Sequence, residues 1–168
     1  MPILNLTFSS QNVNSLNLPG PSKNLEAKVA AITSIKSDII FLSDIRLVNP
    51  QGVNNDFRVT AAFKDSKHRS YSMYHNSKKN SRGVAILIGN TLDIDVLGIE
   101  KEQNENFILI RASLGKNLLI MGAIYGPNST DRAFFNTLER SIERISGGRT
   151  IPVILGGGLE CHMGLARR

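Results

Sequence analysis

The apolar positions of this chain recur mostly with the spacing of β-strands. Continuous apolar runs at residues 38–43 and 83–89 are typical of strands buried on both faces. A hairpin is expected around Gly115-Lys116-Asn117, because apolar runs flank this short polar turn. Shorter or alternating runs predict further strands at residues 3–8, 57–62, 70–75, 92–97, 107–114, 118–125 and 151–155.

Two segments have the period of an amphipathic helix instead. The first has its apolar stripe at Leu25, Val29 and Ile32, with Ser22 or Asn24 as the expected cap. The second is expected to be capped by Ser129 or Thr130, to end at Gly147-Gly148, and to bury Phe134, Leu138, Ile142 and Ile145. Two helices within a series of mostly adjacent strands predict an α/β (α+β) sandwich with a mixed sheet and helices outside. A doubly wound nucleotide-binding fold would alternate strand and helix more regularly and carry a glycine-rich first turn.

The length and composition fit one globular domain. A chain of 168 residues with 41% hydrophobic residues can bury roughly 70% of its unfolded surface. Its apolar runs are too short to span a bilayer, and its start lacks the pattern of a secretory signal. A single cysteine, Cys161, suits a reducing compartment, so an intracellular location is expected.

Positive charge is concentrated in one segment. Residues 64–82 hold six basic side chains and one acid, a net charge of +5 within a chain of net charge +6. The six are Lys64, Lys67, Arg69, Lys78, Lys79 and Arg82, and tyrosines and histidines lie between them. Basic residues interleaved with aromatic ones suit binding to a phosphate backbone and to unstacked bases. A solvated loop is the alternative interpretation.

Several polar residues follow directly after predicted buried strands. They are Asn12, Asp44, Tyr125, Asn128 and the glycine turn at 156–158. If these strand ends meet at one edge, they form a cleft with one carboxylate, two amides and a phenol. A carboxylate with neighbouring oxygens suits Mg²⁺, and an amide and a phenol can orient a phosphate. The alternatives are an Asx-turn at Asn12, pairing of Asp44 with Arg46, and a core position for Tyr125.

Taken in order, five motifs resemble the endonuclease/exonuclease/phosphatase superfamily. They are QNVNSLN, FLSDIRL, SRGVAILI, IYGPN and PVILGG, at residues 11–17, 41–47, 81–88, 124–128 and 152–157. Within that superfamily the sequence is most similar to the apurinic-type endonuclease domain of non-LTR (LINE-type) retrotransposons. The resemblance implies a four-layer α/β/β/α sandwich that nicks DNA with Mg²⁺, in the nucleus where the retrotransposon works.

The same resemblance implies roles for individual residues. Asp44 would hold the metal, where the family most often has Glu, and Asn12 would lie beside it. Tyr125 and Asn128 would hold the scissile phosphate, and the basic segment would face DNA. Hydrolysis would follow from a metal that stabilises charge on the phosphate.

The sequence departs from the family at its late motifs. Gly158 stands at the position of the family's catalytic aspartate and Glu160 at that of its asparagine. The family's final strands and Asp–His pair have no counterpart, and His162 lies too early to match that histidine. We therefore expect a single, monomeric but incomplete domain over residues 1–168, with a core at 3–157, an irregular tail at 158–168, an unpaired sheet edge and no catalytic turnover.

Three alternatives remain at this stage. The chain could be a nucleic-acid-binding module without catalysis that uses the basic segment 64–82. It could be another phosphodiesterase or phosphatase of the superfamily, such as a phosphoinositide phosphatase or a sphingomyelinase. It could also be a fragment that does not fold stably.

Overall fold

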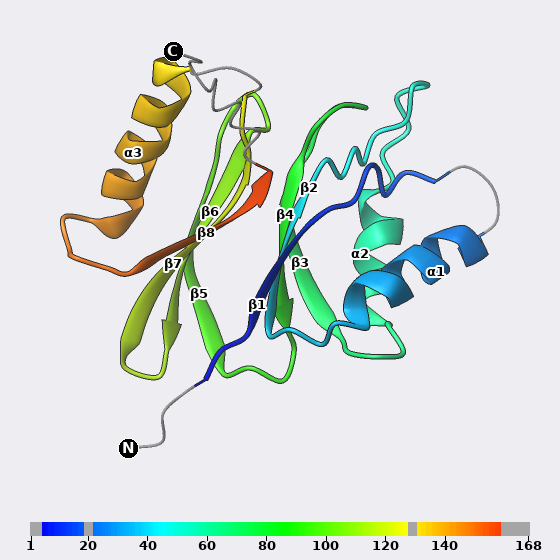
Figure 1. Cartoon of the computed structure of the whole chain (residues 1–168), viewed down its shortest axis with the longest axis horizontal. Helices are drawn as coiled ribbons and strands as arrows, with labels where there is room; N and C mark the ends of the chain where they lie inside the picture. The colour runs from blue at the N-terminus through cyan, green and yellow to red at the C-terminus, as the bar shows by residue number, and fades with distance from the viewer. Residues whose placement is uncertain (1–4, 19–21, 128–130, 159–168) are drawn as a thin grey trace, which may run out of the picture.

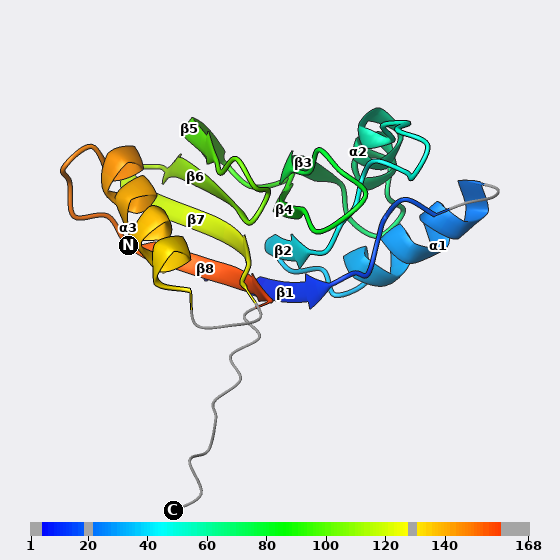
Figure 2. The same ribbon diagram turned by 90° about the horizontal axis from the view of Figure 1, so that it is seen from above.

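Two four-stranded β-sheets pack face to face, with helices on both outer faces (Figures 1 and 2). The structure is a computed structural model, and it describes residues 5–18, 22–127 and 131–158. The layers follow the order helices, sheet, sheet, helix, which confirms the expected α/β/β/α sandwich.

The first sheet has the strand order β1-β2-β4-β3. Its strands are β1 (Phe8–Asn12), β2 (Ile39–Ser43), β3 (Tyr71–Asn76) and β4 (Val84–Gly89). β1 and β2 are parallel, whereas β4 runs antiparallel to both β2 and β3. Helices α1 (Ser22–Thr33) and α2 (Asp56–Lys64) cover its outer face, where Leu25, Val29 and Phe63 pack against Ile40 and Leu87.

The second sheet has the order β5-β6-β7-β8. Its strands are β5 (Ile94–Lys101), β6 (Phe107–Leu114), β7 (Asn117–Tyr125) and β8 (Val153–Gly158). The hairpin expected at Gly115-Lys116-Asn117 joins β6 to β7, and β8 returns parallel to β7 after helix α3 (Arg132–Ser146). Phe134 and Leu138 of α3 pack on Phe107 and Leu109, as the helical stripe predicts.

Two predictions, which concern helices α2 and α3, are wrong. Residues 57–62 form part of helix α2 rather than a strand, because Val59 and Phe63 lie one helical turn apart and are buried together. Phe57, which also fitted an alternating pattern, is 88% exposed. The cap of α3 is Asp131, whose carboxylate accepts from the backbone N–H groups of Ala133 and Phe134, whereas Ser129 and Thr130 lie outside the described residues.

The first strand lies later in the chain than predicted. It spans Phe8–Asn12 instead of residues 3–8, and it consists mainly of polar residues. Backbone hydrogen bonds to the buried strand β2 hold it, so it needs few apolar side chains of its own. Phe8 nevertheless packs against the core between the sheets and stacks on Phe41.

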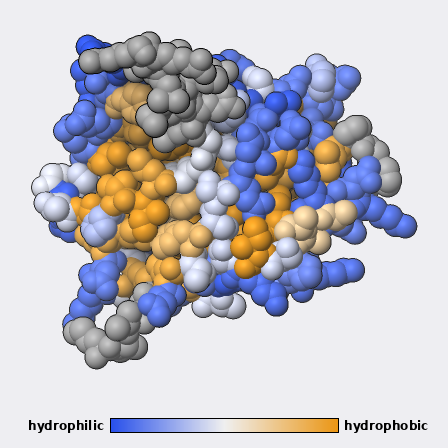
Figure 3. Space-filling model, in the orientation of Figure 1, coloured by the Kyte–Doolittle hydropathy of each residue, from blue (hydrophilic) through white to orange (hydrophobic). Residues whose placement is uncertain are grey.

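Strand β8 forms an edge of the second sheet, and it includes the three glycines at which the sequence suggested that it would end. Pro152 and Gly158 direct their carbonyl groups toward β7, so by alternation the peptide groups of Val153 and Leu155 face the free side. The side chains of Val153 and Leu155 are 38% and 43% exposed on the outer face. Figure 3 shows hydrophobic surface over this half of the molecule.

Candidate functional site

Strand ends from both sheets meet at one edge of the sandwich. β1 and β2 end at Asn12 and Ser43, and β7 and β8 end at Tyr125 and Gly158. A Cβ atom added to Gly158 would lie 3.5 Å from Oγ of Ser43, which places the ends of β8 and β2 in contact. We call this region the strand-end edge, comprising residues 12–16, 43–47, 76–83, 105–106, 125–126 and 158. The predicted convergence of Asn12, Asp44 and Tyr125 at one edge is therefore observed.

Asp44 is held by Arg46 at this edge. Nε of Arg46 donates to Oδ1 of Asp44 at 2.7 Å, and Nη2 donates to Oδ2 at 2.7 Å. The Asp44 side chain is only 7% exposed, whereas that of Arg46 is 39% exposed. Both carboxylate oxygens thus face a guanidinium, and the pairing that the sequence left as an alternative is confirmed.

Other charges and a phenol surround this pair. Nζ of Lys28 in α1 donates to the carbonyl oxygens of Asn14 and Ser15, at 3.2 and 2.6 Å. Burial lowers the pKa of Lys28, and the neighbouring Asp44 carboxylate partly opposes this shift. The hydrogen bond to Asp44 raises the pKa of Arg46, and the charges of Asp44 and Tyr125 add to the effect. The half-buried Tyr125 also packs against the core between the sheets, as its alternative interpretation stated.

The turn between β3 and β4 is anchored beside the pair. The N–H groups of Ile45 and Arg46 donate to the carbonyl oxygens of Gly83 and Arg82. The buried carboxylate of Glu105 accepts from the N–H groups of Lys78 and Lys79, at 2.7 and 3.2 Å. The turn is therefore fixed from two directions, while the side chains of Lys78, Lys79 and Arg82 are exposed.

Buried Asn76 ties the turn to the second sheet. Its amide nitrogen donates to the carbonyl oxygens of Glu102 and Phe107, at 2.7 and 2.9 Å. Nη1 of Arg82 adds a bond of 2.9 Å to Oδ1 of Asn106.

Left-handed backbone conformations are concentrated at this edge. Among the described residues, seven that are not glycine have positive φ, and all except Lys36 belong to the strand-end edge or contact it directly. These six are Asn14, Ser15, Asp44, Arg46, Arg82 and Glu105. Such conformations cost about 1 kcal/mol or more each, and they gather at functional sites where surrounding contacts hold them.

The remaining predicted site residues are placed less closely or lie outside the described residues. Oδ1 of Asn12 accepts from the N–H of Asn14 at 3.1 Å, which is the Asx-turn of the alternative interpretation. Asn128 and Glu160, like His162 and Cys161, lie outside the residues that the structure describes.

The basic segment does not form one patch. Lys78, Lys79 and Arg82 lie at the strand-end edge, whereas Lys64, Lys67 and Arg69 lie at the opposite end of β3. About 17–20 Å of strand separates the two groups. Arg69 is engaged in the structure, since its Nη2 pairs with Oδ1 of Asp38 at 2.8 Å.

The three glycines of β8 have different surroundings. A Cβ atom on Gly156 would collide with the Phe41 ring, and one on Gly157, where φ is +136°, would collide with the carbonyl oxygen of Ile124. Gly158 has neither restriction. The position at which the resemblance places a catalytic aspartate can therefore accept a side chain but has none.

The donor groups described at this edge do not fit the Mg²⁺ ion that the resemblance implies. Two carboxylates lie at this edge: Asp44 already binds a guanidinium through both oxygens, and Glu105 accepts from the backbone N–H groups of Lys78 and Lys79. Lys28 adds a further positive charge near Asp44. Within residues 5–18, 22–127 and 131–158, no group of three or more acidic, histidine or cysteine side chains could hold a metal ion. Mg²⁺ usually needs one or two free carboxylates.

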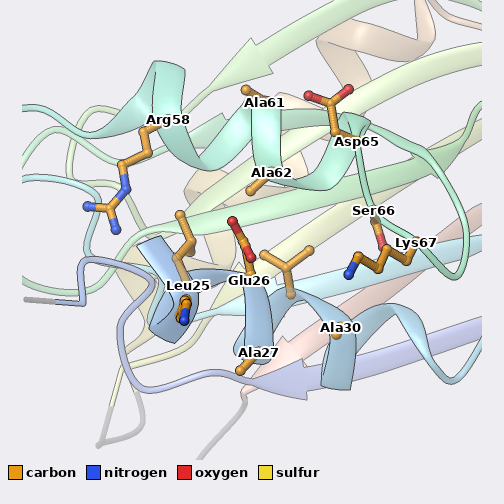
Figure 4. A pocket seen from close by; sticks show the side chains of 12 residues that line it. Leu25, Glu26, Ala27, Ala30, Arg58, Ala61, Ala62, Asp65, Ser66 and Lys67 are labelled. Carbon is orange, nitrogen blue, oxygen red and sulfur yellow. The ribbon is translucent and has the colours of Figure 1, made fainter. Parts of the chain in front are cut away.

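A groove between α1 and α2 lies apart from this edge. Figure 4 shows side chains of both helices facing one another across it, with Arg58 and Lys67 far apart along its length. Its volume is about 580 Å³, and the small apolar side chains of Ala27, Ala30 and Ala62 are among those that line it. Since its charges are mixed in sign and belong to no strand end, we do not assign the candidate site to it.

No protein-family model and no curated protein matches the sequence. Solved structures do match. TDP2 from Caenorhabditis elegans is 19% identical with a TM-score of 0.62, over 97% of this chain and 49% of that one. The AP endonuclease LMAP from Leishmania major is 15% identical with a TM-score of 0.65, over 90% and 54%. The endonuclease domain of TRAS1, a telomere-specific non-LTR retrotransposon, is 11% identical with a TM-score of 0.55, over 94% and 62%.

The chain has the endonuclease/exonuclease/phosphatase fold. It spans between 49% and 62% of the length of these three structures. The first two motifs, QNVNSLN and FLSDIRL, begin in the last residues of the parallel strands β1 and β2 and continue into the strand-end edge.

Sequence reasoning assigned no binding role to several residues of the strand-end edge and its surroundings. Arg46 lies in the FLSDIRL motif, so its position two residues after Asp44 could have suggested a role beyond pairing. Lys28 and Glu105 gave no such signal, because they reach the edge from α1 and from the β5–β6 turn.

Proposed function

We propose that this chain is a retrotransposon-type endonuclease-like domain that binds DNA at the strand-end edge without hydrolysing it. One observation carries the proposal: basic side chains lie at the strand-end edge, and a glycine stands where the resemblance places the catalytic aspartate. Lys78, Lys79 and Arg82 bring positive charge to the strand ends, while Gly158 offers no carboxylate.

Binding is favoured by the charge and by the anchored backbone. Each lysine or arginine that neutralises a phosphate releases counterions, so affinity should fall steeply with salt. Tyr125 and Asn12 would contact the bound strand beside Arg46, and Asn128 would join them. The solved structures support a nuclease-type origin, since one is an AP endonuclease and one a retrotransposon endonuclease domain.

Gly158 and the pairing of Asp44 with Arg46 disfavour hydrolysis. Loss of a general base lowers a rate by about 10²–10⁴-fold, and Gly158 stands where the resemblance places that base. The Mg²⁺ that the resemblance implies at Asp44 and Asn12 finds both Asp44 oxygens occupied by Arg46. No step of a reaction is therefore assigned to a metal here.

The test combines a binding assay with a nicking assay on the full chain. Fluorescence anisotropy of a labelled DNA duplex should show binding that weakens with salt, and supercoiled plasmid with Mg²⁺ should stay intact. Nicking that disappears in Asp44→Ala would refute the inactive state and restore the Mg²⁺-dependent alternative. Absence of DNA binding at low salt would refute the proposal itself.

None of the helices in the described part of the chain has the length and apolar character needed to cross a membrane.

A further inference from the structure

Arg46 occupies the position at which a cation would neutralise Asp44. Its Nε and Nη2 atoms each lie 2.7 Å from a different oxygen of the Asp44 carboxylate. This parallel pair of bonds is the strongest geometry available to an arginine and a carboxylate. The charge of Asp44 is therefore already balanced by the protein.

The backbone holds the pair in this arrangement. Asp44 and Arg46 both have left-handed φ values, of 59° and 43°. The N–H of Arg46 donates to the carbonyl oxygen of Arg82 at 2.9 Å, which fixes the segment against the β3–β4 turn. The two side chains thus project from a backbone that contacts elsewhere in the fold stabilise.

Arg46 retains donors for a ligand. Among the described residues none accepts a hydrogen bond from Nη1, and the side chain is 39% exposed. A guanidinium held on one side by a carboxylate presents its other N–H groups in a fixed direction, which suits a phosphate. Lys28, which interacts electrostatically with Asp44, adds positive charge nearby, so a phosphate is favoured there and a further cation is not.

We propose that Arg46 replaces a divalent cation at the strand-end edge and binds a nucleic-acid backbone phosphate directly, with Asp44 as its positioning residue. This inference rests on the proposed DNA binding and deepens it. Binding is then independent of metal, and Asp44 acts through Arg46 rather than as a metal ligand.

The first experiment measures anisotropy of a labelled duplex with the full chain, in EDTA and in MgCl₂ at matched ionic strength. We expect the two dissociation constants to agree within about twofold. Arg46→Gln should weaken binding in EDTA about tenfold, because a charge-assisted contact is lost. Arg140→Gln, which removes an exposed arginine from α3, is the matched control and should change affinity little.

The direction in which Asp44→Asn changes the DNA affinity tests the positioning role of Asp44. Asp44→Asn removes a negative charge beside the ligand, so a purely electrostatic role predicts tighter binding. A positioning role predicts that Asp44→Asn weakens binding. It also predicts that the double variant Arg46→Gln/Asp44→Asn binds no more weakly than Arg46→Gln alone. Thermal melts of each variant establish that it folds. Tighter binding of a folded Asp44→Asn variant would overturn the positioning role.

The claim that Arg46 takes the place of a divalent cation is tested without DNA. Mg²⁺ should not raise the Tm of the wild-type chain beyond an equal ionic strength of NaCl, since a ligand stabilises only the state that it binds. In Arg46→Gln the freed carboxylate should allow a Mg²⁺-dependent rise. A rise in wild type that Asp44→Asn abolishes would overturn the inference.

The outcomes separate the two proposals. Binding in MgCl₂ but not in EDTA overturns this inference and leaves DNA binding standing. Absence of binding in both buffers overturns both.

Discussion

The backbone of Gly158, at the end of β8, lies against the buried hydroxyl of Ser43, at the end of β2. Among the described residues, a Cβ atom at Gly158 would meet only that Oγ, at 3.5 Å, whereas a Cβ atom at Gly157 would collide with the carbonyl oxygen of Ile124. Two adjacent residues of one sequence, chemically identical, therefore have opposite tolerance to substitution.

We expect Gly158→Ala to change the free energy of unfolding by less than about 1 kcal/mol. Gly157→Ala should lower it by about 3 kcal/mol or more, since it combines a collision with a backbone conformation that favours glycine. Urea denaturation of both variants measures the difference. Equal losses would contradict the arrangement of β7 and β8.

The two ends of the basic segment should differ in DNA binding. Replacing Lys78 and Lys79 by Gln should weaken duplex binding and reduce the slope of log affinity against log salt by about 1.8. Replacing Lys64 and Lys67 by Gln removes the same charge from the opposite end of β3 and should leave the slope almost unchanged. Anisotropy titrations at several salt concentrations measure both slopes, and similar losses would show a nonspecific charge effect.

Asp38 should make stability sensitive to acid. Its carboxylate accepts from N–H and O–H of Thr7 and from Arg69, each at 2.8 Å. Burial raises the pKa of Asp38, but these hydrogen bonds outweigh it, so the net pKa lies below the usual value. A lowered pKa in the folded state gives stability that is present above about pH 4 and lost as pH falls further.

The Asp38→Asn variant tests this contribution. It should lower the free energy of unfolding at neutral pH by about 1–2 kcal/mol and flatten its dependence on pH below 4. Thermal melts from neutral to acidic pH give the comparison. An unchanged acid dependence would assign that dependence to other carboxylates.

The start of α3 depends on one side chain. Oδ1 of Asp131 accepts from the N–H groups of Ala133 and Phe134, at 2.9 and 3.3 Å. Asp131→Ala should destabilise the protein by about 1 kcal/mol, whereas Asp131→Asn, which keeps an acceptor, should cost less. Chemical denaturation of the pair checks the cap, and equal costs would indicate that charge rather than capping matters.

The fold was predictable where one pattern dominated. The strands at β2 and β4 are continuous apolar runs, and α3 has an unbroken helical stripe. Helix α2 was mistaken because Phe57, Val59 and Ala61 alternate as in a strand, and only the burial of Phe63 with Val59 distinguishes the two. Strand β1 was misplaced because its partner β2, and not its own composition, stabilises it.

The candidate site was predictable in position but not in detail. Residues that follow parallel strands gather at one edge, so the convergence of Asn12 with Asp44 follows from the strand pattern. The orientation of Arg46 depends on backbone bonds to Arg82 and Gly83, which are remote in sequence. The division of the basic segment likewise depends on β3, whose length carries Lys78 away from Lys64.

The exposed edge of strand β8 affects how the protein associates in solution. Within residues 5–18, 22–127 and 131–158, no strand pairs with the outer side of β8, so its peptide groups beside the exposed side chains of Val153 and Leu155 form a template onto which another strand can add. The isolated chain should therefore associate with itself as its concentration rises, and sedimentation should then show larger species. A lysine at position 153, introduced as Val153→Lys, places a charge on that edge and should keep the chain dispersed without touching the strand-end edge.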